Sequence, residues 1–211
     1  MTSYLNRALM IGLLCSAPGA AATTIFINEF HYDNNGADVN EGIEIAAAAG
    51  TNLSGLHLVL YNGSNGTSYA DTALKGIVPD QYGGYGTLYF ALPGIQNGPD
   101  GIVLATIDGE VLQFLSYEGV FIANEGVAAG MTSVDIGIFE TPDSDLLSSL
   151  QLVGNGVVFD DFTWIQTDAS PGFLNAGQVF TAPVPLPGTV VLMISALGAL
   201  FGCRRSSQAA T

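Results

Sequence analysis

The chain has 211 residues, with 19 Asp and Glu against four Lys and Arg, and its formal net charge is −15 at pH 7. All of the carboxylates lie between residues 23 and 183, where Lys75 is the only Lys or Arg. Such a surface cannot neutralise phosphates, which excludes nucleic acid as an expected partner.

The first 22 residues have the layout of a secretory signal peptide. Arg7 gives a positive start, residues 8–15 form a short apolar core, and Ala20-Ala21-Ala22 supplies a small-residue cleavage site at Ala20 and Ala22. The apolar core is too short to span a bilayer. We therefore expect export and cleavage after Ala22. The alternative is a retained N-terminal anchor.

The body of the protein, residues 23–180, reads as all-β. Short β-branched or aromatic runs alternate with Gly, Asn and Asp about every ten residues. We expect strands at 24–30, 42–46, 56–61, 87–92, 102–107, 110–115, 149–153 and 162–165. This number of short strands in about 160 residues indicates one two-sheet sandwich. Both cysteines, Cys15 and Cys203, lie outside the body, so no disulfide is expected in it.

Local patterns add detail to these strands. In the second one, Ile43 and Ile45 lie on one face and Glu44 on the other. The third, 56–61, alternates only in part, which predicts burial on both of its faces. Asp108-Gly109 joins two β-rich runs and predicts a tight type I′ hairpin. The single tryptophan, Trp164, is predicted to lie in the core.

The loop after the first predicted strand is rich in oxygen ligands, which Ca²⁺ takes in groups of six to eight from flexible loops. The predicted Ca²⁺ ligands are Glu29, Asp33, Asn35, Asp38 and Glu41, and Asn40 lies among them. The spacing is not that of an EF-hand. The alternative is an Asx-rich turn whose polar side chains satisfy the loop backbone. Asp160-Asp161 forms a second acidic pair, and His31 borders the loop.

No motif of nucleophilic or zinc-dependent catalysis is present. The chain has no Gly-x-Ser-x-Gly, no His-Glu-x-x-His and no cysteine in its body, and His31 and His57 are its only histidines. Metal-dependent nucleases need His, Asp and Asn together with cations that hold the phosphate. We therefore predict that the protein is not an enzyme.

Five segments of the body share one recognisable pattern. Residues 27–45 combine a strand carrying Asn28-Glu29, an acidic loop, and a second strand that begins at Glu41 and contains Glu44; residues 113–119, 149–154, 162–164 and 169–177 continue it. The pattern resembles the lamin-tail domain, in the version that precedes secreted nuclease domains of the endonuclease/exonuclease/phosphatase type in many bacteria. The resemblance implies an immunoglobulin-like sandwich over 23–180. Two departures stand out: no nuclease domain follows Gly177, and Gly42 replaces a usual aromatic residue, which predicts looser packing there.

The last residues, 181–211, form a predicted sorting tail. Its motif is Val184, Pro185, Leu186, Pro187 and Gly188; an apolar segment runs to Cys203, and Arg204 and Arg205 form a basic stop. The tail resembles the VPLPA-CTERM class of sorting signals, a relative of PEP-CTERM, which implies recognition and cleavage by an exosortase. The segment 188–203 would be roughly 24 Å long as a helix, a short membrane span. The alternative is an ordinary tail anchor.

Together these features predict an exported, non-enzymatic protein of the cell surface or extracellular matrix. It would pass through the inner membrane, meet an exosortase there, and then contact matrix proteins or polysaccharide, with Ca²⁺ as the only candidate cofactor. Two alternatives remain open: an enzyme or accessory protein related to secreted metal-dependent nucleases that lacks the catalytic domain, and a Ca²⁺-dependent adhesion module.

Overall fold

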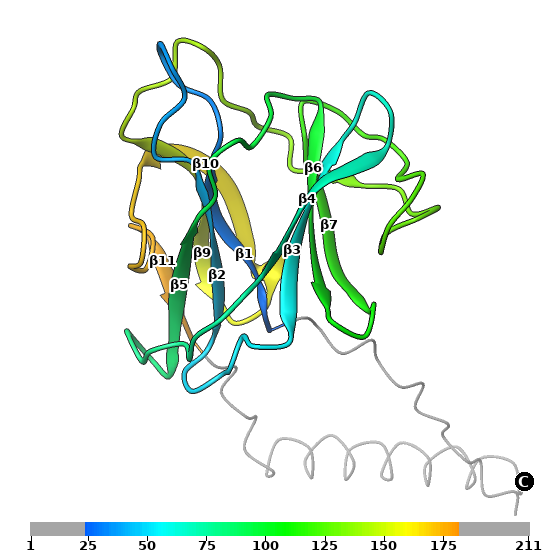
Figure 1. Ribbon diagram of the computed structural model, residues 1–211. Coiled ribbons are helices and arrows are strands. Elements are labelled where there is room, and N and C mark those ends of the chain that lie inside the picture. Colours follow the sequence, from blue (N-terminus) through cyan, green and yellow to red (C-terminus); the bar gives the residue numbers. More distant parts are fainter. Residues whose placement is uncertain (1–23, 182–211) are drawn as a thin grey trace, which may run out of the picture.

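The computed structural model describes residues 24–181, which form two β-sheets (Figure 1). The predicted signal peptide (1–22) and residues 182–211 of the predicted sorting tail, with its motif, apolar segment and basic stop, lie outside the described residues. Within 24–181 there is no α-helix, and no helix of this span is long and apolar enough to cross a membrane.

Eleven strands build the two sheets. The first sheet has the order β10-β9-β1-β2-β5, with β11 paired parallel to β9; its strands are β1 (Phe26–His31), β2 (Gly42–Ala48), β5 (Tyr85–Ala91), β9 (Ser148–Gly156), β10 (Phe162–Asp168) and β11 (Gln178–Phe180). The second sheet has the order β4-β3-β6-β7-β8, from β3 (Leu56–Asn62), β4 (Thr67–Ala73), β6 (Asp100–Thr106), β7 (Val111–Tyr117) and β8 (Val134–Asp135). A 3₁₀ turn, η1 (Phe159–Asp161), precedes β10.

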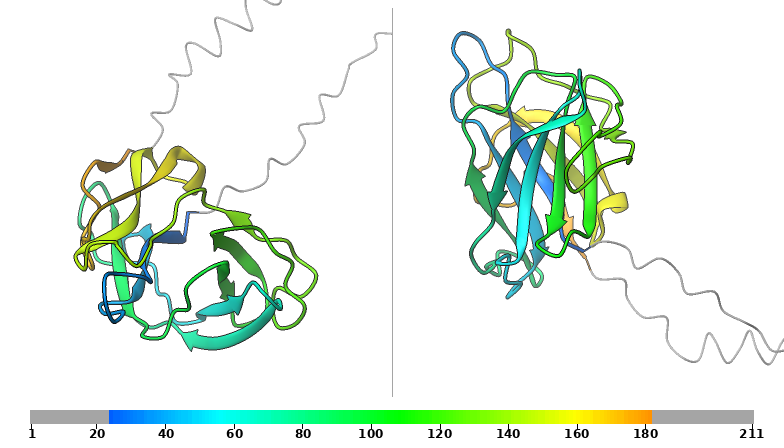
Figure 2. Two further views of the ribbon diagram at one scale, coloured as in Figure 1. Left: turned by 90° about the horizontal axis from the view of Figure 1, so that it is seen from above. Right: turned by 45° about the vertical axis from the view of Figure 1, so that its right-hand side comes forward.

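The main core fills the space between the sheets, which face each other in the view from above (Figure 2). Alternate residues of the longer strands point into it, because successive side chains of a strand lie on opposite faces. Phe30 meets Trp164 edge to face at 5.4 Å between ring centroids, and Tyr32 stacks on Tyr117 at 4.2 Å. The prediction that Trp164 belongs to the core is confirmed.

The third predicted strand is buried on both faces, as its pattern indicated. Leu58 and Leu60 of β3 join the main core. Val59 and Tyr61 join a second, smaller cluster on the outer face of the second sheet. The segment that follows β7 covers this cluster with Phe121 and its neighbours up to Ala128.

The β6–β7 hairpin is confirmed, but the predicted turn type is wrong. A type I′ turn needs positive φ at both central residues. Among the hairpin residues only Gly109 has positive φ, at 90°. Its N–H donates to the carbonyl of Thr106 at 2.9 Å, so the turn encloses Ile107 and Asp108 and the left-handed glycine follows it. The link is therefore one residue longer than the Asp-Gly pair suggested.

Gly42 does not loosen the packing of β2. Tyr89 of β5 lies over its Cα on the outer face, and a Cβ at this position would collide with the Tyr89 hydroxyl and with the carbonyl of Phe90. The Tyr89 hydroxyl also donates to the carbonyl of Asn40 at 2.9 Å. A tyrosine from the neighbouring strand thus fills the space that the glycine leaves.

The described domain begins and ends at the same end of the sandwich, the lower end in Figure 1. The rings of Phe26 in β1 and Phe180 in β11 stack there, with centroids 6.4 Å apart. The loops 32–41 and 141–147 lie at the opposite, upper end (Figure 1). We call this upper end the distal end.

Candidate functional site

The residues predicted to bind Ca²⁺ do not come together in the structure. Asp33, Asn35 and Asp38 lie in the distal loop 32–41, where Asp33 is buried and the other two are exposed. The Glu41 carboxylate accepts a hydrogen bond from the Gly94 N–H at 2.8 Å. The carboxylate of Glu29 accepts hydrogen bonds in another part of the first sheet. Within 24–181 no group of three or more His, Cys, Asp or Glu side chains lies close enough to hold a metal ion, and the Ca²⁺ site stays a prediction.

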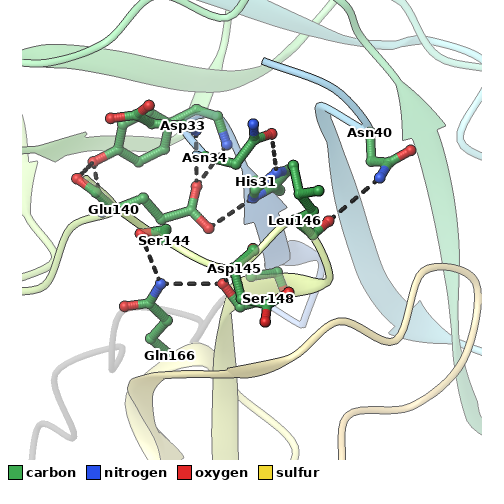
Figure 3. Close-up of polar contacts among 12 residues, drawn as sticks. His31, Asp33, Asn34, Asn40, Glu140, Ser144, Asp145, Leu146, Ser148 and Gln166 are labelled. Atoms are coloured by element: carbon green, nitrogen blue, oxygen red, sulfur yellow. Dashed lines mark hydrogen bonds and ion pairs between the residues drawn. The ribbon is translucent and has the colours of Figure 1, made fainter. Parts of the chain in front are cut away.

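A buried ion pair anchors the distal loop. Nδ1 of His31, at the end of β1, lies 2.7 Å from Oε1 of Glu140, whose side chain is fully buried (Figure 3). Nε2 of His31 lies 3.2 Å from Oδ1 of Asn34, and the same oxygen accepts the Val39 N–H. Both ring nitrogens therefore face acceptors. An imidazolium can donate to both, whereas a neutral imidazole can donate to only one.

The protonation of His31 follows from the same contacts. Burial lowers the pKa of His31, but the hydrogen bond and the negative charge of Glu140 outweigh that effect, so the net pKa is raised. The second oxygen of Glu140 accepts the N–H groups of Tyr32 and Asp33 at 2.7 and 3.1 Å. One carboxylate thus fixes the side chain of His31 and the start of the loop after β1.

Further carboxylates surround this pair. The Tyr32 hydroxyl donates to Glu118 at 2.8 Å and accepts the N–H of Glu140 at the same distance. Burial raises the pKa of Tyr32, and the Glu118 carboxylate raises it further. Burial also raises the pKa of Asp33, with added repulsion from Asp38 and Glu140. These contacts hold the loop in place. The sequence did not predict the role of Glu140, because this residue lies 109 residues from His31.

The two distal loops are joined directly. The N–H of Asn35 donates to the carbonyl of Ser144 at 3.0 Å. The Asn40 amide donates to the carbonyl of Leu146 at 3.3 Å (Figure 3). The Ser144 hydroxyl also accepts from Gln166 of β10. The loops 32–41 and 141–147 therefore form one hydrogen-bonded rim above the first sheet.

A second polar cluster holds the segment 169–177, here called the closing segment, against the outer face of the first sheet. Glu29 of β1 stands directly opposite Glu44 of β2 in the strand register. Glu29 accepts the N–H and the hydroxyl of Ser170, both at 2.9 Å, and the hydroxyl of Ser149 at 2.7 Å. Glu44 accepts the N–H of Gly172 at 2.6 Å. Both carboxylates thus bind the closing segment through its backbone.

Glu44 is fully buried beneath this segment. The sequence pattern placed Glu44 opposite Ile43 and Ile45, and the structure agrees, but that face is covered rather than open to solvent. Burial raises the pKa of Glu44 to about 8, and the neighbouring Glu29 charge acts in the same direction, against the hydrogen bonds that it accepts. The Asn28 amide donates to Glu44 at 3.0 Å.

The second acidic pair predicted from the sequence has a local role. The carboxylate of Asp161 accepts the N–H groups of Val157 and Val158 at 2.8 and 3.0 Å, across the η1 turn. These backbone hydrogen bonds lower its pKa. Asp160 is exposed beside it.

Between the two polar clusters lies a groove of about 740 Å³ on the outer face of the first sheet. Its floor includes Glu29 and His31 of β1, and Tyr89 of β5 forms part of one side. Leu146 and Leu147 of the distal rim and Pro171 of the closing segment give it apolar walls. Carboxylates of Glu29, Glu41, Asp145 and Asp168 belong to residues that line it. It is an acidic, partly apolar groove.

Comparison with models of protein families, with curated proteins and with solved structures found no match for this chain. The resemblances to the lamin-tail domain and to exosortase sorting signals therefore stand on the sequence patterns alone.

Proposed function

We propose that this chain is an exported, non-enzymatic binding module of the cell surface or extracellular matrix. Its sandwich is of the immunoglobulin-like, lamin-tail type, and an exosortase recognises Val184 to Gly188 in its tail. One observation carries the proposal. The described domain begins and ends at one end of the sandwich, and the acidic groove lies near the other.

This arrangement suits a protein that is held at its C-terminus. A tail anchored in the membrane would follow the end of the sandwich where Phe180 lies. The distal rim would then face away from the membrane. The positive-inside rule would keep Arg204 and Arg205 on the cytoplasmic side of the inner membrane. After cleavage by the exosortase, the acidic module would pass to the surface or matrix.

The contacts of the titratable side chains support a non-enzymatic role. A general acid or base must reach a substrate proton. His31 is instead paired with Glu140, and Glu29 and Glu44 bind the closing segment. Each of these groups has its hydrogen bonds within the domain, where it fixes a loop.

Fractionation of the source cells, followed by mass spectrometry of the mature protein, tests the proposal. We expect an N-terminus at Thr23 and a C-terminus between Val184 and Gly188, in the surface or extracellular fraction. A chain intact to Thr211 in the inner membrane would identify an ordinary tail anchor instead, and a cytoplasmic protein would refute export. Replacement of both Pro185 and Pro187 by Ala should block processing, whereas replacement of Pro171, which precedes the motif in the sequence and is not part of it, should leave processing unchanged.

A further inference from the structure

We propose that the groove on the first sheet binds a segment of a partner protein that carries lysine or arginine side chains beside small apolar ones. The inference deepens the proposed function and rests on it for the outward orientation of the groove. It assigns the class of partner from three properties of the groove: its charge, its apolar walls and its fixed shape.

Charge is the first property. Four residues with carboxylates line the groove: Asp145 and Asp168 are exposed, whereas Glu29 and Glu41 are buried and accept hydrogen bonds from the domain. Lys75, the only Lys or Arg between residues 24 and 181, does not line it. The surface is therefore complementary to positive charge, and complementary potentials favour association and select the partner.

The walls give the second property. Leu147 is 70 % exposed and Leu146 is 44 % exposed, although leucine side chains are normally buried. The two lie beside carboxylates, so the groove offers apolar area and negative charge side by side. Lysine and arginine match this combination, because their methylene stems pack on apolar surface while their charged ends reach oxygen atoms.

Shape is the third property. Asn40 ties the rim at Leu146, and Ser170 ties the closing segment to Glu29. Because one hydrogen bond joins the two rim loops and another holds the closing segment to β1, the groove exists before a partner arrives, and a preformed site loses little conformational entropy on binding. A flexible peptide segment can fit such a groove without rearranging it.

The same properties disfavour two other occupants. A second copy of the domain would bring 19 carboxylates against Lys75 alone and would be repelled. A neutral polysaccharide would satisfy hydrogen bonds but would leave the carboxylates without an opposite charge. Both remain measurable outcomes of the test.

The test is calorimetric titration of the full chain, kept in a neutral detergent, with a capped hexapeptide of alternating lysine and alanine. A hexapeptide with glutamine in place of lysine is the reference ligand. We expect binding of the lysine peptide only, and weaker binding at high salt. Asp168→Asn and Leu147→Ala should each lower the affinity by about threefold, the usual scale for one rim contact.

Two variants at the opposite end of the sandwich are matched controls. Glu110→Gln removes the same charge and Ile107→Ala truncates an exposed apolar side chain, both in the β6–β7 hairpin. They should leave the affinity within experimental error. Equal losses in test and control variants would show attraction to net charge alone and would overturn the inference. No heat with the lysine peptide, self-association, or heat only with a neutral polysaccharide such as dextran would overturn it as well.

The outcome is separable from that of the proposed function. A correctly sorted protein whose groove ignores the peptide would refute the inference and leave the proposed function standing. A protein that binds the peptide through Asp168 but stays in the cytoplasm would refute the proposed function instead.

Discussion

Glu140→Gln is the sharpest probe of the distal rim. The substitution keeps the size and shape of the side chain but turns one of its two oxygens into an NH₂ group. One oxygen of Glu140 faces His31 and the other accepts the N–H groups of Tyr32 and Asp33. If the NH₂ group faces Tyr32 and Asp33, their N–H groups lose the acceptor. If it faces His31, the ring must lose its proton to accept from it, and the buried ion pair is lost in either case.

The expected loss follows from the burial of this group. The Glu140 side chain has no exposed area and the His31 side chain has 5 %, so solvent cannot replace the lost bond. Breaking a buried ion pair by removing one partner costs about 3–5 kcal/mol. The substitution retains part of the hydrogen bonding, and we expect a loss of about 3 kcal/mol in the free energy of unfolding. For a domain of this size that corresponds to a fall of about 6–12 °C in Tm.

Fluorescence provides the assay. Trp164 is the only tryptophan and lies in the core, so its emission in urea reports unfolding of the described domain. The measurement is made at pH 6, where His31 is protonated, on wild type and on Glu140→Gln. Glu110→Gln makes the same chemical change at an exposed position and should cost less than about 0.5 kcal/mol. A loss below about 1 kcal/mol in Glu140→Gln would refute the role assigned to this carboxylate.

Three further predictions concern pH and packing. Because the net pKa of His31 is raised, the stability advantage of wild type over His31→Gln should be largest below about pH 6.5 and should decline as pH rises; an advantage independent of pH would contradict this. Burial raises the pKa of Glu44 from 4.5 to about 8, so the folded state favours its protonated form. The free energy of unfolding of the wild type should therefore fall as pH rises between these values, and Glu44→Gln should lack this fall in urea unfolding. Gly42→Ala should lower stability by about 1–3 kcal/mol in thermal unfolding, because its methyl group meets Tyr89 and backbone; an unchanged Tm would show that Tyr89 moves aside freely.

The strands that the sequence predicted are those whose pattern is local. Ile43 and Ile45 lie on either side of Glu44, and the run 56–61 is largely apolar on both faces, so two or three residues suffice to indicate a strand and its burial. The strands that were missed lack such a pattern. β4 has exposed and half-buried polar residues, and β8 and β11 have two and three residues. These strands exist because a neighbouring strand offers unpaired backbone groups.

The turns likewise depend partly on local sequence and partly on contacts between strands. Asp108-Gly109 identified a hairpin because glycine accepts positive φ at low cost. It did not fix the turn type, since the register of β6 against β7 shifts near Ala105. That register depends on which side chains of the two strands enter the core, and a dipeptide carries no information about it.

The candidate site was the part that only tertiary structure could decide. The acidic loop was visible as a run of oxygen-bearing residues, but Glu29 and Glu41 turn to partners outside it. Glu140 reaches His31 across 109 residues, and the closing segment buries Glu44 across 128. A sequence determines locally which face of a strand a side chain occupies. Whether that face meets water, a partner or another part of the chain depends on contacts between distant segments, because a buried carboxylate and an exposed one have the same sequence pattern.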